Sequence, residues 1–177
     1  LQAYEDSGAL PEPDITAKEP PLAAYGMDAA PDTIVASLRK LFDARDERSY
    51  LAIMAYVARN EDSLAALQEL RRVVTEALDM PVTLGFGPRF LHSTGQLHKG
   101  GPPTGLFLQI TSDDAEDMHI PGEAYSLGTL KRAQAIGDLN ALRETDRDVL
   151  GLRIQGDPIQ GLAEIAVTVN NSTDDTQ

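Results

Sequence analysis

The sequence predicts a three-layer α/β/α domain with a mostly parallel sheet of about four or five strands. Short apolar runs alternate along the chain with longer segments whose apolar residues have helical spacing. The apolar runs are nearly continuous, as in strands that are buried on both faces. Strands that alternate with helices pair in parallel and carry helices on both faces of the sheet. A chain of 177 residues is long enough to bury one substantial core.

The first 30 residues are rich in proline, glycine, alanine and acids, and they predict a linker or an extended N-terminal segment. Within them, residues 1–7 resemble the end of a helix that stops at Gly8. We place the α/β domain at residues 31–170 and a disordered tail at residues 171–177. Because the chain begins with leucine, we expect a fragment of a longer protein.

Four elements are predicted before residue 87. A helix is predicted over about 32–45, with Asp32 as its N-cap. The apolar run SYLAIMAYV (residues 49–57) predicts a buried strand, and Asn60 predicts the cap of a second helix. The run PVTLGF (residues 81–86) predicts a second strand. The second helix presents one apolar stripe, made of Leu64, Leu67, Leu70, Val74 and Leu78.

Four more elements follow. The run GLFLQIT (residues 105–111) predicts a third strand. A third helix is expected over about 126–143, with Ser126 as its N-cap. The run DVLGLRIQ (residues 148–155) predicts a fourth strand. Asp157 is followed by proline, which is the usual order of an N-cap and a first helical residue, so a last helix should run to about Val169.

Composition excludes several classes of partner. The formal net charge is -13, which disfavours binding to nucleic acid or to an anionic membrane surface. No apolar run reaches transmembrane length. Cysteine is absent, so no disulfide or thiolate metal site can form, and we expect a cytoplasmic protein. Residues 89–101 contain basic side chains and two histidines but no acid, so this stretch can accept a small anion.

The best candidate for a site is the polar, glycine-rich loop at residues 85–104. It leaves the carboxyl end of the second predicted strand, where parallel sheets bind ligands. Its glycines allow the backbone to approach a ligand closely. The candidate groups are Arg89 and Lys99 for a phosphate, Ser93, Thr94 and Gln96 for sugar hydroxyls, and His92 and His98 for proton transfer.

The alternative is an ordered loop whose polar side chains satisfy its own backbone. The loop contains neither a Walker phosphate-binding pattern nor a dinucleotide GxGxxG pattern. We expect no metal site, because His92 and His98 have no obvious third ligand and His119 lies in a distant acidic stretch. Lys131, on the third predicted helix, is either a solvated lysine or a phosphate or proton partner of the loop.

Two long segments also resemble a known family. They are GPRFLHSTGQLHKGGPPTGLFLQIT and, further on, IPGEAYSLGTLKRAQAIGDLNAL. They resemble the C-terminal part of the bacterial fusion of transaldolase with glucose-6-phosphate isomerase. The resemblance covers about residues 50–154, with weaker similarity in residues 1–12. It implies a sugar-isomerase (SIS-like) α/β domain, interconversion of glucose 6-phosphate and fructose 6-phosphate, and no metal or organic cofactor.

The resemblance also implies roles for single residues. Ordinary glucose-6-phosphate isomerases carry a ring-opening histidine in a similar pattern, which here falls on His92, with Gln96 and His98 following it. The family's phosphate-binding Ser/Thr clusters and its Glu base find no counterpart in this chain. The implied partners are therefore the upstream isomerase and transaldolase domains of the same polypeptide, and the fragment should not turn over alone. Two alternatives remain open: an accessory or assembly domain, and a module that binds sugar phosphates.

Overall fold

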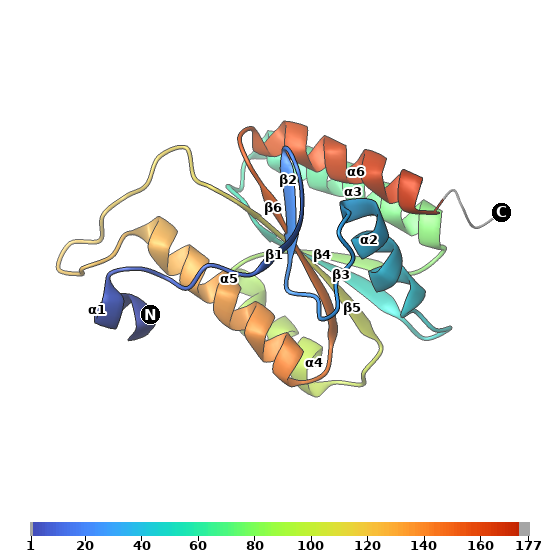
Figure 1. The fold of residues 1–177 in the computed structure, drawn as a ribbon, viewed down its shortest axis with the longest axis horizontal. Coiled ribbons are helices and arrows are strands. Elements are labelled where there is room, and N and C mark those ends of the chain that lie inside the picture. Colours follow the sequence, from blue (N-terminus) through green and yellow to red (C-terminus); the bar gives the residue numbers. More distant parts are fainter. Residues whose placement is uncertain (1, 174–177) are drawn as a thin grey trace.

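A computed structural model describes residues 2–173 and contains a six-stranded sheet of order β1-β2-β6-β5-β3-β4 (Figure 1). Strands β3 to β6 run parallel, whereas β2 runs antiparallel to both β1 and β6. The predicted mostly parallel α/β sheet is therefore confirmed, but it has more strands than the predicted four or five. The strands are β1 (Ile15–Glu19), β2 (Leu22–Tyr25), β3 (Tyr50–Tyr56), β4 (Val82–Phe86), β5 (Gly105–Ser112) and β6 (Asp148–Ile154).

The two additional strands come from the N-terminal segment, where a linker or an extended segment was predicted. Residues 15–25 form a hairpin in which Glu19 pairs with Leu22, and all four residues of β2 are buried. β2 in turn pairs with β6, with Leu22 opposite Ile154. Of the two possibilities predicted for residues 1–30, a linker or an extended segment, the linker does not hold for this hairpin, whose residues are extended and paired within the sheet. A strand of four residues depends for its stability on the strand with which it pairs, so its own sequence carries little signal. The two prolines between β1 and β2 also argue against a strand when the sequence is read alone.

The helices begin near the predicted caps. The Asn60 side-chain oxygen accepts a hydrogen bond from the Ser63 backbone N–H, and the Ser63 hydroxyl accepts one from the Asn60 backbone N–H, which forms a capping box. Ser126 caps α5, but the cap of α2 is Thr33 rather than Asp32. Part of the predicted tail is helical up to Thr173, and residues 174–177 lie outside the described residues. The α-helices are α1 (Gln2–Ser7), α2 (Ile34–Asp43), α3 (Glu61–Leu78), α4 (Thr94–Gly100), α5 (Leu127–Glu144) and α6 (Pro158–Thr173).

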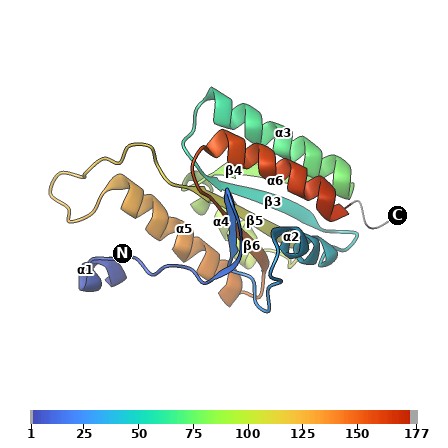
Figure 2. The same ribbon diagram turned by 45° about the horizontal axis from the view of Figure 1, so that its top comes forward.

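The helices form two layers on opposite faces of the sheet (Figures 1 and 2). Helices α2, α3 and α6 cover one face and share its core, whereas α4 and α5 lie on the other face. Alternation along β3 supplies both cores, because Ile53 points to the first face and Met54 to the second. The order of strands reverses between β3 and β5, since β4 lies on one side of β3 and β5 on the other. Ligands of such sheets bind at the carboxyl ends of the strands near this reversal.

The face under α5 is the less apolar of the two. Alternation in β5 sends Leu108 and Ile110 into the core of the first face and leaves Gln109 and Thr111 on the α5 side. In β6, Arg153 lies on the same side, opposite Thr111. Polar groups therefore collect on the α5 face near the carboxyl ends of two adjacent strands.

Candidate functional site

The 85–104 loop predicted from the sequence is largely regular structure. It consists of the end of β4, a 3₁₀ helix at Arg89–Leu91 and the short helix α4. The Phe90 side chain is buried, and its ring meets the Tyr56 ring edge-on with centroids 5.4 Å apart. The chain therefore turns back onto the sheet after β4 instead of extending into solvent.

His98 and Lys99 anchor this segment. The His98 side chain is 5% exposed and lies against three aromatic rings, the closest being Phe107 at a centroid distance of 4.9 Å. Burial lowers the pKa of His98, although the negative charge of Asp138 opposes this effect. The Lys99 Nζ lies 2.5 Å from an Asp138 carboxylate oxygen on α5, and Asp138 is almost completely buried. In this structure, both side chains therefore hold α4 to the sheet and to α5.

The remaining predicted groups face the solvent. The side chains of the five residues that precede or open α4 are exposed. Within residues 2–173, none of the five makes a side-chain hydrogen bond or an ion pair. The segment therefore has an anchored part and a displayed part, and the displayed residues are Arg89, His92, Ser93, Thr94 and Gln96.

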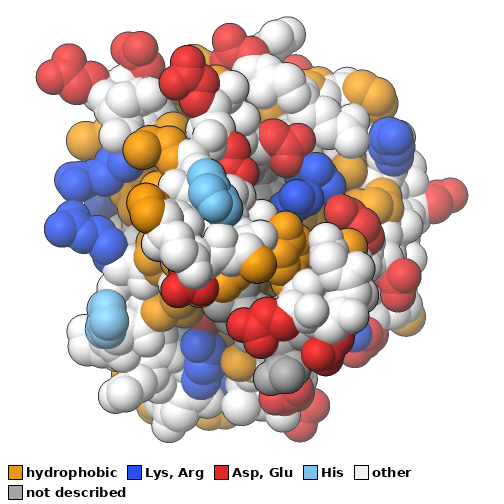
Figure 3. Space-filling view, turned by 90° about the vertical axis from the view of Figure 1, so that its left-hand side faces the viewer, with side chains coloured by type: hydrophobic (Ala, Val, Ile, Leu, Met, Phe, Trp, Pro, Cys, Tyr) orange, Lys and Arg blue, Asp and Glu red, His pale blue; other side chains and the backbone are white. Residues whose placement is uncertain are grey.

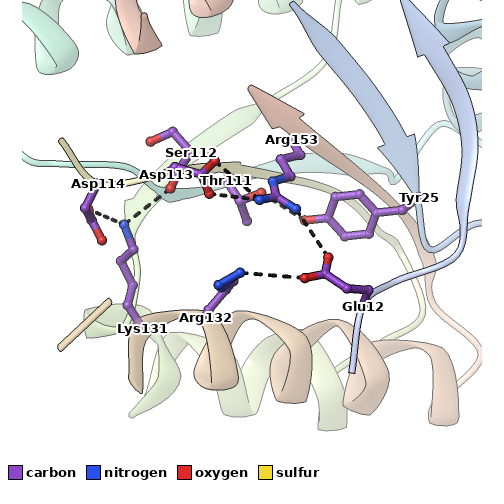
Figure 4. Close-up of polar contacts among 9 residues, drawn as sticks. All are labelled: Glu12, Tyr25, Thr111, Ser112, Asp113, Asp114, Lys131, Arg132 and Arg153. Atoms are coloured by element: carbon purple, nitrogen blue, oxygen red, sulfur yellow. Dashed lines mark hydrogen bonds and ion pairs between the residues drawn. The ribbon is translucent and has the colours of Figure 1, made fainter. Parts of the chain in front are cut away.

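Lys131 has partners elsewhere. Its Nζ lies 2.5 Å from an Asp114 carboxylate oxygen and 3.5 Å from the Ser112 carbonyl oxygen, just beyond the carboxyl end of β5 (Figure 4). Lys131 therefore lies at the end of β5. Its contacts are with Asp114 and Ser112 and not with the 85–104 segment, of which it was one possible partner.

A second site was not predicted from the sequence. A cavity of about 440 Å³ lies between β2, the ends of β5 and β6, helix α5 and residues 10–14. None of its lining residues falls between Ala30 and Gln109, so it is separate from the 85–104 segment. We call it the arginine pocket, because its walls carry Arg132, Arg143 and Arg153. Small-molecule sites commonly have volumes of about 300–1,000 Å³.

The floor of the arginine pocket is a buried hydrogen-bond network. The Tyr25 hydroxyl donates to the Gln109 side-chain oxygen at 3.1 Å and lies 3.3 Å from the Thr111 hydroxyl. The Gln109 side-chain nitrogen donates to the Ala135 carbonyl of α5 at 3.0 Å. Burial raises the pKa of Tyr25 to about 12, so its hydroxyl keeps its proton at neutral pH. Gly151 makes this possible, because a side chain there would collide with the Tyr25 ring.

The rim of the pocket is charged. The Arg153 guanidinium pairs with Asp113 at 3.0 Å and with Glu12 at 3.3 Å, and Arg132 approaches the other Glu12 oxygen at 3.7 Å (Figure 4). At the far end, Arg143 lies 2.5 Å from Asp28. Figure 3 shows acidic, basic and hydrophobic side chains close together on the left-hand side of the molecule in Figure 1, without a continuous basic surface.

The arginine pocket does have a signal in the sequence, namely polar residues inside otherwise apolar strands. Gln109 interrupts GLFLQIT and Arg153 interrupts DVLGLRI, and both side chains lie on the α5 face. A buried strand carries such residues where they have partners or a function.

Comparisons with known proteins place the fold. No family model matches the chain, and no curated protein matches it. Among solved structures, it is similar to a hypothetical protein from Thermus thermophilus, TT0462, with a TM-score of 0.68 and 18% sequence identity. The match covers 82% of this chain and 40% of the Thermus chain. At this identity the similarity establishes an α/β fold with helices on both sides of a mostly parallel sheet.

Residues 2–173 contain neither a candidate membrane span nor a candidate metal-binding cluster. No described helix is both long enough and apolar enough to cross a bilayer. Among the same residues, no three His, Cys, Asp or Glu side chains are grouped to hold a metal ion.

Proposed function

We propose that the chain is the C-terminal, SIS-like module of a glucose-6-phosphate isomerase that is fused to a transaldolase, and that His92 opens the sugar ring. The observation that carries the proposal is the division of the 89–100 segment. Its anchored residues hold it to the fold, while His92 and the polar groups beside it remain exposed and without partners among residues 2–173.

The chemistry fits this arrangement. Opening either cyclic sugar requires a proton to reach the ring oxygen as the anomeric hydroxyl loses one, and imidazole exchanges protons near neutral pH. Ser93, Thr94 and Gln96 offer neutral hydrogen-bonding groups to sugar hydroxyls, and Arg89 offers a guanidinium to the phosphate. The Glu base that forms the enediol would come from the upstream isomerase domain.

The position in the fold also supports the proposal. The first displayed residues, Arg89 and His92, follow β4 beyond its carboxyl end, and this end of the sheet accepts ligands in α/β folds.

His92→Ala in the parent polypeptide tests the proposal. We expect the kcat for conversion of fructose 6-phosphate to fall by about 100-fold or more, because general acid–base groups contribute roughly 10²–10⁴ to rate. Transaldolase activity and oligomeric state should not change. His119→Ala is the matched control, since His119 is also exposed and lies in the segment between β5 and α5.

A kcat of His92→Ala close to that of the parent would contradict the proposal and favour an accessory or assembly domain. Calorimetry of the 177-residue chain with fructose 6-phosphate separates the remaining alternative. Heat of binding at millimolar ligand, together with a normal kcat in His92→Ala, would favour a sugar-phosphate-binding module.

A further inference from the structure

We propose that the arginine pocket binds a small organic anion, a carboxylate or phosphate monoester on an apolar body, and that Glu12 occupies the place of its anionic group. This proposal does not depend on the isomerase assignment, because the pocket shares no residue with the 85–104 segment. It rests on the position of Glu12, on the orientation of the arginines and on the walls of the cavity.

The Glu12 carboxylate bridges two guanidiniums from different elements (Figure 4). Its two oxygens face Arg153 of β6 at 3.3 Å and Arg132 of α5 at 3.7 Å. Paired guanidiniums are a common recognition element for carboxylates and phosphates, because their N–H groups form forks that match the oxygens. The two arginines therefore form an anion site that a residue of the protein itself now fills.

The Glu12 carboxylate can be displaced from the two guanidiniums by a ligand. It lies between α1 and β1, in a stretch without helix or strand, and its side chain is 68% exposed. Ion pairs this exposed contribute little to stability, so withdrawing Glu12 disturbs the fold little. Arg153 would keep its orientation, because its second nitrogen is held by Asp113 at 3.0 Å.

The charge balance favours an anion once this stretch moves. The lining contains three arginines and the acids Glu12, Asp14, Asp28 and Asp113. Glu12 and Asp14 belong to the same N-terminal stretch and would leave together. Asp113 and Asp28 are already paired with Arg153 and Arg143, so the positive charge of Arg132 would be left for a ligand.

The walls define the rest of the ligand. Beyond the arginines, the cavity is lined by Met27, Ala135, Ile136 and Leu139, which suit an aromatic or branched aliphatic body. The Thr111 hydroxyl at the floor offers a hydrogen bond near the anionic end. A fully hydroxylated sugar would leave several of its polar groups against apolar carbon, which is unfavourable.

The test is binding of phenyl phosphate and 3-phenylpropanoate to the 177-residue chain, measured by calorimetry and by amide chemical shifts. Inorganic phosphate and glucose 6-phosphate serve as probes without an apolar body. We expect one or both phenyl compounds to bind more tightly than either of these and to shift the amides of Tyr25 and Arg153. The phosphate and carboxylate arms show which anion the pocket prefers.

Variants then isolate the role of Glu12. Glu12→Gln removes the competing carboxylate and should lower the Kd of the phenyl ligand about three- to fivefold, as expected for the loss of one exposed ion pair. Arg132→Gln should raise the Kd about tenfold, and Arg132→Lys should raise it less. Glu69→Gln is the matched control, because Glu69 pairs with Arg72 on α3, on the opposite face of the sheet.

Three results would overturn the proposal. They are no shift of pocket amides by either phenyl compound at millimolar concentration, inorganic phosphate binding as tightly as phenyl phosphate, and a Kd that is unchanged or raised in Glu12→Gln. His92→Ala should leave every one of these Kd values unchanged, so failure here and failure of the isomerase proposal can be told apart.

Discussion

Replacing Lys99 by methionine should destabilise the protein far more than loss of a surface lysine does. Lys99 lies 2.5 Å from a carboxylate oxygen of Asp138, whose side chain is only 1% exposed. The other Asp138 oxygen has no hydrogen-bond partner among residues 2–173. Lys99→Met therefore leaves a buried carboxylate without its only ion-pair partner in the described chain.

The size of the effect follows from this burial. Removing one member of a buried ion pair typically costs about 3–5 kcal/mol, because the remaining charge stays desolvated. The Lys99 side chain is 28% exposed, so water can reach that side of the pair, and we expect a value near the lower end, about 3 kcal/mol. For a domain of this size, that loss lowers Tm by roughly 6–12 °C.

Urea unfolding at pH 7 measures the loss. The double variant Lys99→Met with Asp138→Leu should recover most of the stability, since replacing both members of a buried pair by apolar groups is often nearly neutral. Arg72→Met is the control, because its partners Glu69 and Glu76 are exposed and its loss should change little. If Lys99→Met and Arg72→Met had similar effects, the buried pair would not be what holds α4 to α5.

Two further substitutions probe the buried polar groups. Tyr25→Phe removes the hydroxyl that donates to Gln109 and should lower the free energy of unfolding by about 1–3 kcal/mol in urea titrations, whereas Tyr4→Phe near the N-terminus should not. Burial lowers the pKa of His98, so the unfolded chain binds a proton at higher pH than the folded chain. The neutral, buried His98 therefore contributes to the free energy of unfolding above about pH 6.5, and this contribution is lost as the pH falls through the lowered pKa. His98→Phe should therefore be less sensitive than the parent to a shift from pH 7.5 to 5, and equal pH dependence would contradict this.

Much of the fold could be predicted because its elements carry their own local signals. Asn60 and Ser126 predict the starts of two helices, and the run SYLAIMAYV predicts a strand that is buried on both faces. The β1–β2 hairpin could not be predicted in this way. Its strands are four or five residues long, and β2 is held by pairing with β6, more than a hundred residues away.

The site was harder to predict for the same reason. The glycines and polar residues of 85–104 are typical of a loop, yet the segment forms α4. His98 packs on Phe107 of β5, and Lys99 pairs with Asp138 of α5, and neither contact is visible from the composition of the 85–104 segment. The arginine pocket joins residues from positions 10 to 153, so its only signal in the sequence is the polar residues within apolar strands.

Helix α5 separates the two candidate sites and supports both of them. Asp138 holds α4 on one side, while the Ala135 carbonyl and the Arg132 guanidinium contribute to the pocket on the other. In each site, one buried polar side chain is held by a structural contact, Asp138 by Lys99 and Tyr25 by Gln109, whereas His92 and Glu12 are exposed. This division implies that changes at His92 and Glu12 affect binding or rate with little loss of stability, whereas changes at Lys99 affect stability first. A stability loss at His92 as large as that at Lys99 would mean that the 89–100 segment is packing throughout, and the case for a site there would fall.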